Sequence, residues 1–221
     1  MKKYLWIILI VGILGFGIFS FFYFSKKHFN FASPYSAEKS IYNTTSNNSN
    51  TDDTTNSYEP SKTISKFVEK EISTFSTKIQ NKKDSNRQGN ITITCSALTN
   101  AIVNPGEIFS FCDIVGESTK EKGYKEANII VKGVETKGLG GGNCQVSSTL
   151  YNAVLAAPEL EVIERHPHSA PVPYIAEGKD AAISYGLHDF KFKNNSSSQI
   201  KIIAENTPDN ITIKLIKLIK E

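Results

Sequence analysis

The stretch between Gly138 and Ala153 constrains the fold of this chain more than any other part of it. Four of its first five residues are glycines, which make a turn, and the residues after them have the spacing of an amphipathic helix that ends before Pro158. The apolar face of that helix is predicted to consist of Val146, Leu150, Val154 and Leu155. The helix would begin near Cys144, so the sequence places a cysteine at a helix N-terminus.

A helix N-terminus carries unpaired backbone N–H groups and partial positive charge. Both stabilise a thiolate, so we expect the pKa of the Cys144 thiol to be lowered and its sulfur to act as a nucleophile. Backbone N–H groups around Cys144 and Gln145, next to Gly141 and Gly142, would bind the oxyanion that forms when a carbonyl is attacked. The alternative is a buried helical cysteine beside a glycine turn, with no chemical role.

The N-terminal segment predicts a membrane anchor. No charged residue occurs between Tyr4 and Phe24, and as a helix these 21 residues would span about 31 Å, which matches the ~30 Å core of a bilayer. A cleaved signal peptide is the alternative, but its apolar region should be shorter and followed by small residues. We expect residues 4–24 to remain in the cell membrane, with the C-terminal part of the chain outside the cell.

Composition divides the chain into three parts. Every residue from 43 to 57 is Asn, Thr, Ser or Asp, so this segment cannot form a core and is predicted to be a disordered tether. The expected organisation is an anchor at 1–27, a tether at 28–62 and one domain at 63–221. The net charge is only +3 and no lysine-rich run occurs outside the anchor flanks, which argues against nucleic acid as a partner.

The domain is predicted to have an α+β fold. Apolar residues have helical spacing over 64–79 and, in competition with a strand pattern, over 91–102, where Asn90 could cap the helix. Strands are expected at 108–111, 129–134, 160–164, 181–185, 190–192, 200–204 and 211–219. Helices thus come mostly first and strands mostly later, which favours N-terminal helices, a cysteine-bearing helix and a mostly antiparallel C-terminal sheet.

A cysteine nucleophile needs a base, and histidine is the usual one. His166 and His168 flank Pro167, which favours an extended backbone, so both rings are expected on one side of the segment and in the wall of a cleft. Asp180 is the carboxylate best placed in the sequence to orient that base. Arg165 could bind a substrate carboxylate, although a solvated strand arginine would have the same pattern.

Residues close to the cysteine allow further interpretations. Ser147 and Ser148 could contact a substrate, or their hydroxyls could bond backbone carbonyls within the helix. A zinc site made of Cys144, His166 and His168 is chemically possible, but this spacing is not a common zinc signature. We therefore expect neither a metal nor a cofactor.

Two cysteines remain outside this region. Cys95 and Cys112 form no CxxC pair and have no regular spacing. We interpret both as small core residues, and a disulfide between them is the alternative.

Several motifs in consistent order resemble the VanW-domain family, over roughly residues 64–205. They are Asn104-Pro-Gly-Glu-Ile-Phe-Ser-Phe, Gly123-Tyr-Lys-Glu-Ala, Gly140-Gly-Gly-Asn-Cys-Gln-Val-Ser-Ser-Thr-Leu-Tyr-Asn-Ala, Glu164-Arg-His-Pro-His-Ser, Gly178-Lys-Asp-Ala-Ala and Asp189-Phe-Lys-Phe-Lys-Asn. Members of that family are identified as L,D-transpeptidases that cross-link peptidoglycan through a cysteine. The resemblance therefore implies a cell-wall enzyme whose partners are peptidoglycan stem peptides.

The resemblance also implies roles for single residues. Cys144 falls on the family's cysteine, His166 and His168 on its paired histidines, and Asp180 on its aspartate. The remaining matches in the cysteine motif are Gly141, Gly142, Gln145, Ser147 and Ser148. By this resemblance, Cys144 would attack the third residue of a stem tetrapeptide, expel the terminal D-alanine and pass the acyl group to an amine of a neighbouring stem. A non-catalytic module for cell-wall binding or glycopeptide resistance is the alternative.

Overall fold

The computed structural model describes residues 66–221. The expected anchor at 4–24 and the expected tether at 28–62 lie outside the described residues. In residues 66–221 no helix is both long enough and apolar enough to cross a membrane.

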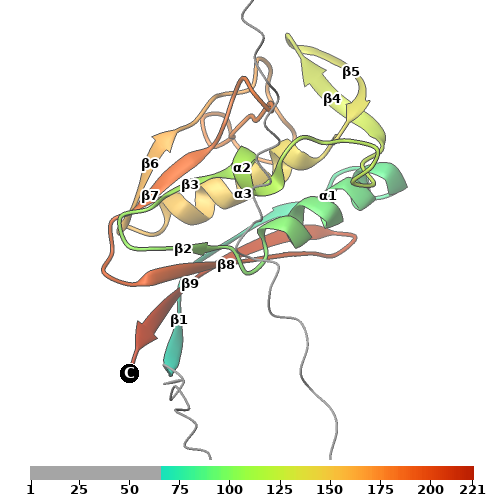
Figure 1. Cartoon of the computed structure of the whole chain (residues 1–221). Helices are drawn as coiled ribbons and strands as arrows, with labels where there is room; N and C mark the ends of the chain where they lie inside the picture. Colours follow the sequence, from blue (N-terminus) through green and yellow to red (C-terminus); the bar gives the residue numbers. More distant parts are fainter. Residues whose placement is uncertain (1–65) are drawn as a thin grey trace, which may run out of the picture. The chain divides into compact units, whose positions relative to one another are not determined.

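The described part of the chain combines helices with antiparallel sheets, so the α+β class is confirmed (Figure 1). In chain order the elements are β1 (Phe67–Lys78), α1 (Ser85–Leu98), β2 (Ile102–Val103), β3 (Ile108–Ser110), α2 (Phe111–Val115), β4 (Glu126–Val131), β5 (Val134–Leu139), α3 (Asn143–Leu155), β6 (Leu160–Glu164), β7 (Lys191–Asn194), β8 (Gln199–Asn206) and β9 (Asn210–Lys220). The strands form a four-stranded sheet in the order β1-β9-β8-β2, a three-stranded sheet in the order β3-β7-β6, and the separate hairpin β4-β5. Every pair of neighbouring strands is antiparallel.

Helix α3 lies at the centre of the described domain. It packs against β1 and β9 of the larger sheet and against β6 of the smaller one, while α1 packs on β8 (Figure 1). The apolar residues of α3 that enter the core are fully buried, and they are Val146, Leu150, Ala153 and Val154. Leu155, which the sequence placed on this face, is 44% exposed because it lies in the last turn. The element that carries Cys144 is therefore held on several sides.

The helix expected over residues 64–79 is wrong, because residues 67–78 form strand β1 beside β9. The two buried side chains of this strand, Ser73 and Thr77, are polar. Ser73 Oγ donates to Ala153 O of α3 at 2.8 Å, and Thr77 Oγ1 shares a hydrogen bond with Thr149 Oγ1 of α3 at 2.8 Å. Since hydroxyl residues occupy inward positions and a bulge precedes Ser73, the period of two that marks a strand is hidden in the sequence. The domain consequently begins with a strand and not with a helix.

Helix α1 is confirmed, but its boundaries differ from the expected ones. It begins six residues before Ile91, and Asp84 caps it by accepting from the N–H of Arg87 at 3.0 Å. Asn90, expected as the cap, is buried inside the helix and donates through Nδ2 to Lys125 O at 2.9 Å and to Gly141 O at 3.1 Å. The amide side chain thus ties α1 to the glycine loop that precedes α3.

Strands β6, β8 and β9 and the β8–β9 hairpin confirm the predicted pattern of the C-terminal half, and β3 confirms the strand expected at 108–111. The strand expected at 190–192 is β7, displaced towards Asn194. The apolar run at 129–134 forms both arms of the β4–β5 hairpin, with Lys132 and Gly133 in the turn at positive φ. The strand expected at 181–185 is wrong, since this segment makes only two isolated bridges, His166 to Ala182 and Ser184 to His188.

Candidate active site

The glycine loop before α3 leaves no room for a Cβ, because neighbouring backbone and side-chain atoms close around it. A Cβ on Gly141 would lie 2.7 Å from Asn128 O of β4, and a Cβ on Gly142 would lie 2.8 Å from Ile91 of α1. Gly142 also has a φ of 119°, which L side chains rarely adopt, and it is the N-cap of α3. Contacts with α1 and β4 therefore fix the turn that delivers Cys144 to the first turn of the helix.

At the start of α3, some backbone N–H groups are hydrogen-bonded within the protein and others are free to bind a ligand. The N–H of Gln145 donates to Gly142 O at 3.0 Å. Contrary to the expectation, this N–H is therefore not available to bind an oxyanion. Within residues 66–221, the N–H of Cys144 has no acceptor. It lies in the first turn of α3, where donors without partners are normal.

The Cys144 thiol is half-buried, and Sγ lies 3.6 Å from Ile183 O, to which it donates. Burial raises the pKa of this thiol above its ordinary value, and the charge of Asp180 adds to the increase. A backbone hydrogen bond at Ile183 and the charge of Arg87 lower the pKa but do not cancel the effect of burial. The expected lowering of the thiol pKa is thus wrong, because burial outweighs the hydrogen bond at Ile183 and the charge of Arg87. The resting sulfur is a thiol.

His168 is held by Asp180 in a geometry suited to a base. Asp180 Oδ2 accepts from the backbone N–H of His168 at 2.6 Å and from its ring Nδ1 at 2.6 Å, and Oδ1 accepts from Arg165 Nη2 at 2.6 Å. Burial alone would raise the pKa of Asp180, but the hydrogen bonds from His168 outweigh it and leave the pKa below its ordinary value. The ionised carboxylate thereby fixes the imidazole with Nδ1 protonated and Nε2 available as an acceptor.

Cys144 and His168 line the same pocket, which has a volume of about 750 Å³. In residues 66–221 no hydrogen bond joins the thiol to this ring; Nε2 of His168 instead lies 3.4 Å from the hydroxyl of Tyr174, which also lines the pocket. The other walls come from the glycine loop, the β4–β5 hairpin and the segment around Ile183. The structure thus brings a cysteine, a histidine and an orienting aspartate to one cavity from separate parts of the chain.

His166 does not share the environment of His168. Its Nε2 is 2.9 Å from Glu164 Oε1, its ring lies 4.3 Å from the ring of His188, and it does not line the Cys144 pocket. Hydrogen bonds from Lys191 and His166 lower the pKa of Glu164 to about 2. The expectation that both imidazoles form one cleft wall is therefore wrong. The rings lie apart because His166 is hydrogen-bonded to Glu164 and His168 is hydrogen-bonded to Asp180.

The residues expected to contact substrate after Cys144 are mostly internal. Ser147 and Ser148 are fully buried, and both hydroxyls donate to Cys144 O, at 3.1 and 2.7 Å. Ser148 Oγ also accepts from the N–H of Ala181 at 2.9 Å. The two serines therefore hold the segment after Asp180 against α3, which is how Asp180 reaches the site.

The two arginines of the chain have different partners, which the sequence alone did not predict. Arg165, expected to bind a substrate carboxylate, donates to Asp180 through both Nε and Nη2, and its guanidinium lies 5.6 Å from the ring centre of Tyr151. Arg87 was assigned no role, yet it lines the Cys144 pocket and donates through Nη2 to Gln145 Oε1 at 2.8 Å. Only its rarity as one of two arginines could have singled it out.

The structure also describes the other two cysteines and bears on the alternative of a zinc site. Cys95 and Cys112 are free and buried, which confirms them as core residues and leaves no disulfide between them. Burial raises the pKa of each to about 12. Within the part of the chain that the structure describes, no group of three or more His, Cys, Asp or Glu side chains could hold a metal ion.

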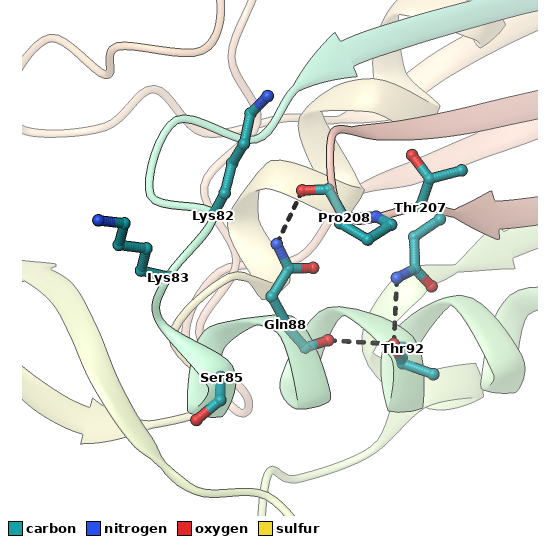
Figure 2. A pocket seen from close by; sticks show the side chains of 8 residues that line it. Lys82, Lys83, Ser85, Gln88, Thr92, Thr207 and Pro208 are labelled. Carbon is teal, nitrogen blue, oxygen red and sulfur yellow. Dashed lines mark hydrogen bonds between the residues drawn. The ribbon is translucent and has the colours of Figure 1, made fainter.

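A second pocket of about 410 Å³ shares no lining residue with the Cys144 pocket. Figure 2 shows it between the start of α1 and the β8–β9 turn, where Gln88 Nε2 donates to Pro208 O at 2.9 Å. Lys82 and Lys83 lie at its rim, and Lys82 is paired with Asp209. Its lining contains no cysteine, histidine or carboxylate.

Comparison with known proteins identifies the relatives of this domain. The model of a family described as VanW like protein matches residues 86–216. The chain is 44% identical over 135 residues to the uncharacterized protein YoaR of Bacillus subtilis, an alignment that covers 61% of this chain and 44% of YoaR. It is 34% identical over 122 residues to the vancomycin B-type resistance protein VanW of Enterococcus faecalis, covering 53% of this chain and 44% of VanW.

The alignments span less than half the length of both relatives. No solved structure matches the chain.

Proposed function

The chain belongs to the VanW family, and from this premise we propose that it is a cysteine-dependent L,D-transpeptidase acting on peptidoglycan stem peptides. The observation that carries the proposal is the meeting of Cys144 and His168 in one pocket, with Asp180 accepting from Nδ1 of the histidine at 2.6 Å. A nucleophile, a base and a group that orients the base are the parts that acyl transfer requires.

In the first half-reaction, Cys144 attacks the carbonyl carbon of the third residue in a stem tetrapeptide. Because burial raises the pKa of the thiol, His168 Nε2 must take the proton as the carbon–sulfur bond forms. The open N–H of Cys144 is the candidate donor to the oxyanion. The carbon–nitrogen bond then breaks, His168 gives the proton to the leaving amine, and D-alanine departs while the acyl group stays on Cys144 as a thioester.

In the second half-reaction, the side-chain amine of a diamino acid on a neighbouring stem attacks the thioester. His168 accepts a proton from that amine, the carbon–sulfur bond breaks, and the Cys144 sulfur regains its proton. The product is an amide cross-link between two third residues. If water replaces the amine, the same groups make the enzyme a carboxypeptidase.

We also propose that the protein acts at the outer face of the cell membrane. The uncharged run from Tyr4 to Phe24 supports an anchor, and the 43–57 segment supports a tether between that anchor and the domain. Such an arrangement would place the Cys144 pocket near the peptidoglycan layer.

A second candidate function is a module that binds cell-wall peptides without turning them over. One observation favours it: no hydrogen bond joins Cys144 to His168 in residues 66–221, and Tyr174 is the neighbour of His168 Nε2. One relative is named a vancomycin B-type resistance protein, which is compatible with an accessory role in glycopeptide resistance. Catalytic hydrogen bonds are often long before substrate binds, so the enzyme is the better-supported candidate.

Covalent capture separates the two candidates. The protein is incubated with a carbapenem, which acylates nucleophilic thiols, and its intact mass and proteolytic peptides are measured. The enzyme predicts one adduct localised to Cys144, which Cys144→Ala abolishes and Cys112→Ala retains. An unmodified Cys144 in a folded protein would favour the binding module.

A further inference from the structure

Arg87 is a fixed cation on the wall of the Cys144 pocket. Its Nη2 donates to Gln145 Oε1 at 2.8 Å, and Gln145 is itself buried, with Nε2 donating to Thr77 Oγ1 at 3.1 Å and to Lys78 O at 3.0 Å. The guanidinium is therefore positioned by an amide that strand β1 holds in place. This differs from a surface arginine, whose long side chain is free to move.

The guanidinium of Arg87 shares its pocket with three carboxylates of the described residues, Asp84, Glu117 and Glu135, but is hydrogen-bonded to Gln145 and forms an ion pair with none of them. Gln145 is neutral, and no carboxylate of residues 66–221 forms an ion pair with Arg87. Asp84, at the same end of α1, uses Oδ1 to cap the helix by accepting from the backbone N–H of Arg87. The positive charge of Arg87 acts on the nucleophile, because it opposes the rise in the pKa of the Cys144 thiol. The pocket that holds Cys144 thus presents a cation that forms no ion pair with a carboxylate of residues 66–221.

The chemistry of a single-residue leaving group provides a matching anion. In a peptide that ends one residue after the scissile bond, three covalent bonds separate the attacked carbon from the carbon of the terminal carboxylate, a distance below about 4 Å. One additional residue moves that carboxylate up to about 3.6 Å further away. A cation fixed on the wall of the pocket that holds the nucleophile can therefore distinguish the two chain lengths.

We propose that Arg87 binds the terminal carboxylate of the donor peptide, so that the site selects chains ending one residue after the bond that Cys144 attacks. This inference rests on the proposed acyl-transfer function. The ligand class is a short peptide with a free C-terminal carboxylate, and its neutral C-terminal amide is a poor ligand. A guanidinium suits this task because its planar donors match the two oxygens of a carboxylate.

Binding to the full chain carrying Cys144→Ala tests the proposal without turnover. Titration calorimetry compares a synthetic stem tetrapeptide ending in D-alanine with its C-terminal amide and with the pentapeptide that has one further D-alanine. The tetrapeptide acid should bind about tenfold or more tightly than either, as expected for a charge-assisted contact. Arg87→Gln should remove this preference, Arg87→Lys should keep part of it, and Lys83→Gln, a change in the other pocket, should leave it unchanged.

The outcomes are distinguishable from a failure of the proposed function. If Arg87→Gln keeps the preference for the acid, or if neither peptide binds to the Cys144→Ala protein, the carboxylate site is wrong. If Arg87→Gln only moves the pH dependence of Cys144 alkylation and leaves the preference intact, the cation serves the thiolate and the proposal is overturned. A retained acid preference together with no turnover by the unmodified protein would support the carboxylate site and refute the transpeptidase.

Discussion

At the scale of single residues, Cys144 is subject to opposing influences. The first turn of α3 and the charge of Arg87 favour a thiolate, whereas burial favours the thiol and prevails. A thiol at rest would make the proposed reaction depend on His168, whose ring Asp180 holds through Nδ1. The same thiol is protected from adventitious oxidation when no substrate is bound, because the thiolate is the reactive form.

The two histidines should differ sharply when each is replaced. His168→Ala should lower the rate of D-alanine release by about 10²–10⁴, because it removes the only imidazole on the Cys144 pocket in residues 66–221. His166→Ala should change that rate less than about tenfold, because His166 contacts Glu164 and His188 instead. Steady-state kinetics on a disaccharide tetrapeptide gives both values. Equal losses from the two substitutions would contradict the assignment of His168 as the base.

The reactivity of Cys144 should report a thiol and not a preformed thiolate. Because the folded pKa lies above the ordinary value, iodoacetamide should modify the protein slowly at neutral pH and faster as the pH rises past that value. The same shift means that burial of the neutral thiol adds stability at lower pH, which is lost as the pH rises through the folded pKa.

Mass spectrometry after alkylation over a pH series measures this profile. Cys95 and Cys112 should stay unmodified in the folded protein, because both are buried and have pKa values of about 12. A rate that has already reached its plateau below the ordinary cysteine pKa would show that a thiolate exists at rest.

At the scale of elements, the glycine loop is where α1, β4 and α3 meet. Asn143, the first residue of α3, is buried there, with its Oδ1 accepting from Thr94 Oγ1 of α1 at 2.7 Å and its Nδ2 donating to Ser118 Oγ at 3.0 Å. Gly141 O accepts from the buried Asn90 of α1 at 3.1 Å. These bonds fix the start of α3 from both sides and so fix the height of Cys144 in its pocket.

Two glycine substitutions should have opposite effects on stability. Gly141→Ala should cost about 1–3 kcal/mol of unfolding free energy, because its Cβ would meet backbone atoms of Ala127 and Asn128 at 2.9 and 2.7 Å. Gly89→Ala should add about 0.5–1 kcal/mol, because Gly89 lies inside α1 and a Cβ there meets nothing within 4 Å.

Urea unfolding followed by circular dichroism measures both changes. A neutral Gly141→Ala would contradict the close contact between the loop and β4. A loss of stability in Gly89→Ala would contradict the open surface of α1 at that position.

The elements also show what sequence patterns could and could not predict. Strands β6, β8 and β9 were predictable because their buried residues are apolar and follow one period. Helix α3 was predictable from the helical spacing of Val146, Leu150 and Val154, although it also buries polar side chains. Strand β1 was not, because Ser73 and Thr77 occupy inward positions where they bond α3. The 181–185 segment looked like a strand because its apolar residues alternate, yet Ser147 and Ser148 fix its backbone instead of a neighbouring strand.

At the scale of the whole molecule, the candidate site draws on segments far apart in the chain. Cys144 could be identified from its own motif, and His168 and Asp180 from their residue types. Their pairing, the separation of His166, and the arrival of Arg87 at the pocket all depend on how α1, α3 and the two larger sheets pack. These are long-range contacts that the local spacing of residues does not encode. The sequence therefore predicted which residue types form the candidate site but not how they are arranged.

The described domain should fold without the N-terminal region. The described residues, 66–221, belong to one compact unit. A protein shortened to these residues, and a full chain from which residues 43–57 are deleted, should each unfold in one cooperative transition with the same midpoint as the intact chain, because a polar segment of that composition adds no core. Differential scanning calorimetry checks this. Midpoints that differ by many degrees would show that the N-terminal region stabilises the domain.

The account depends most on acyl transfer by Cys144. The direct measurement is incubation of the protein with disaccharide tetrapeptide, followed by mass spectrometry of the muropeptides. The account predicts cross-linked dimers and free D-alanine from the unmodified protein and from Cys112→Ala, with neither product from Cys144→Ala, whose fold should be intact. Cys144→Ser should be nearly as inactive, because a serine hydroxyl is much harder to deprotonate than a thiol. Dimers formed at an undiminished rate by Cys144→Ala would contradict the account.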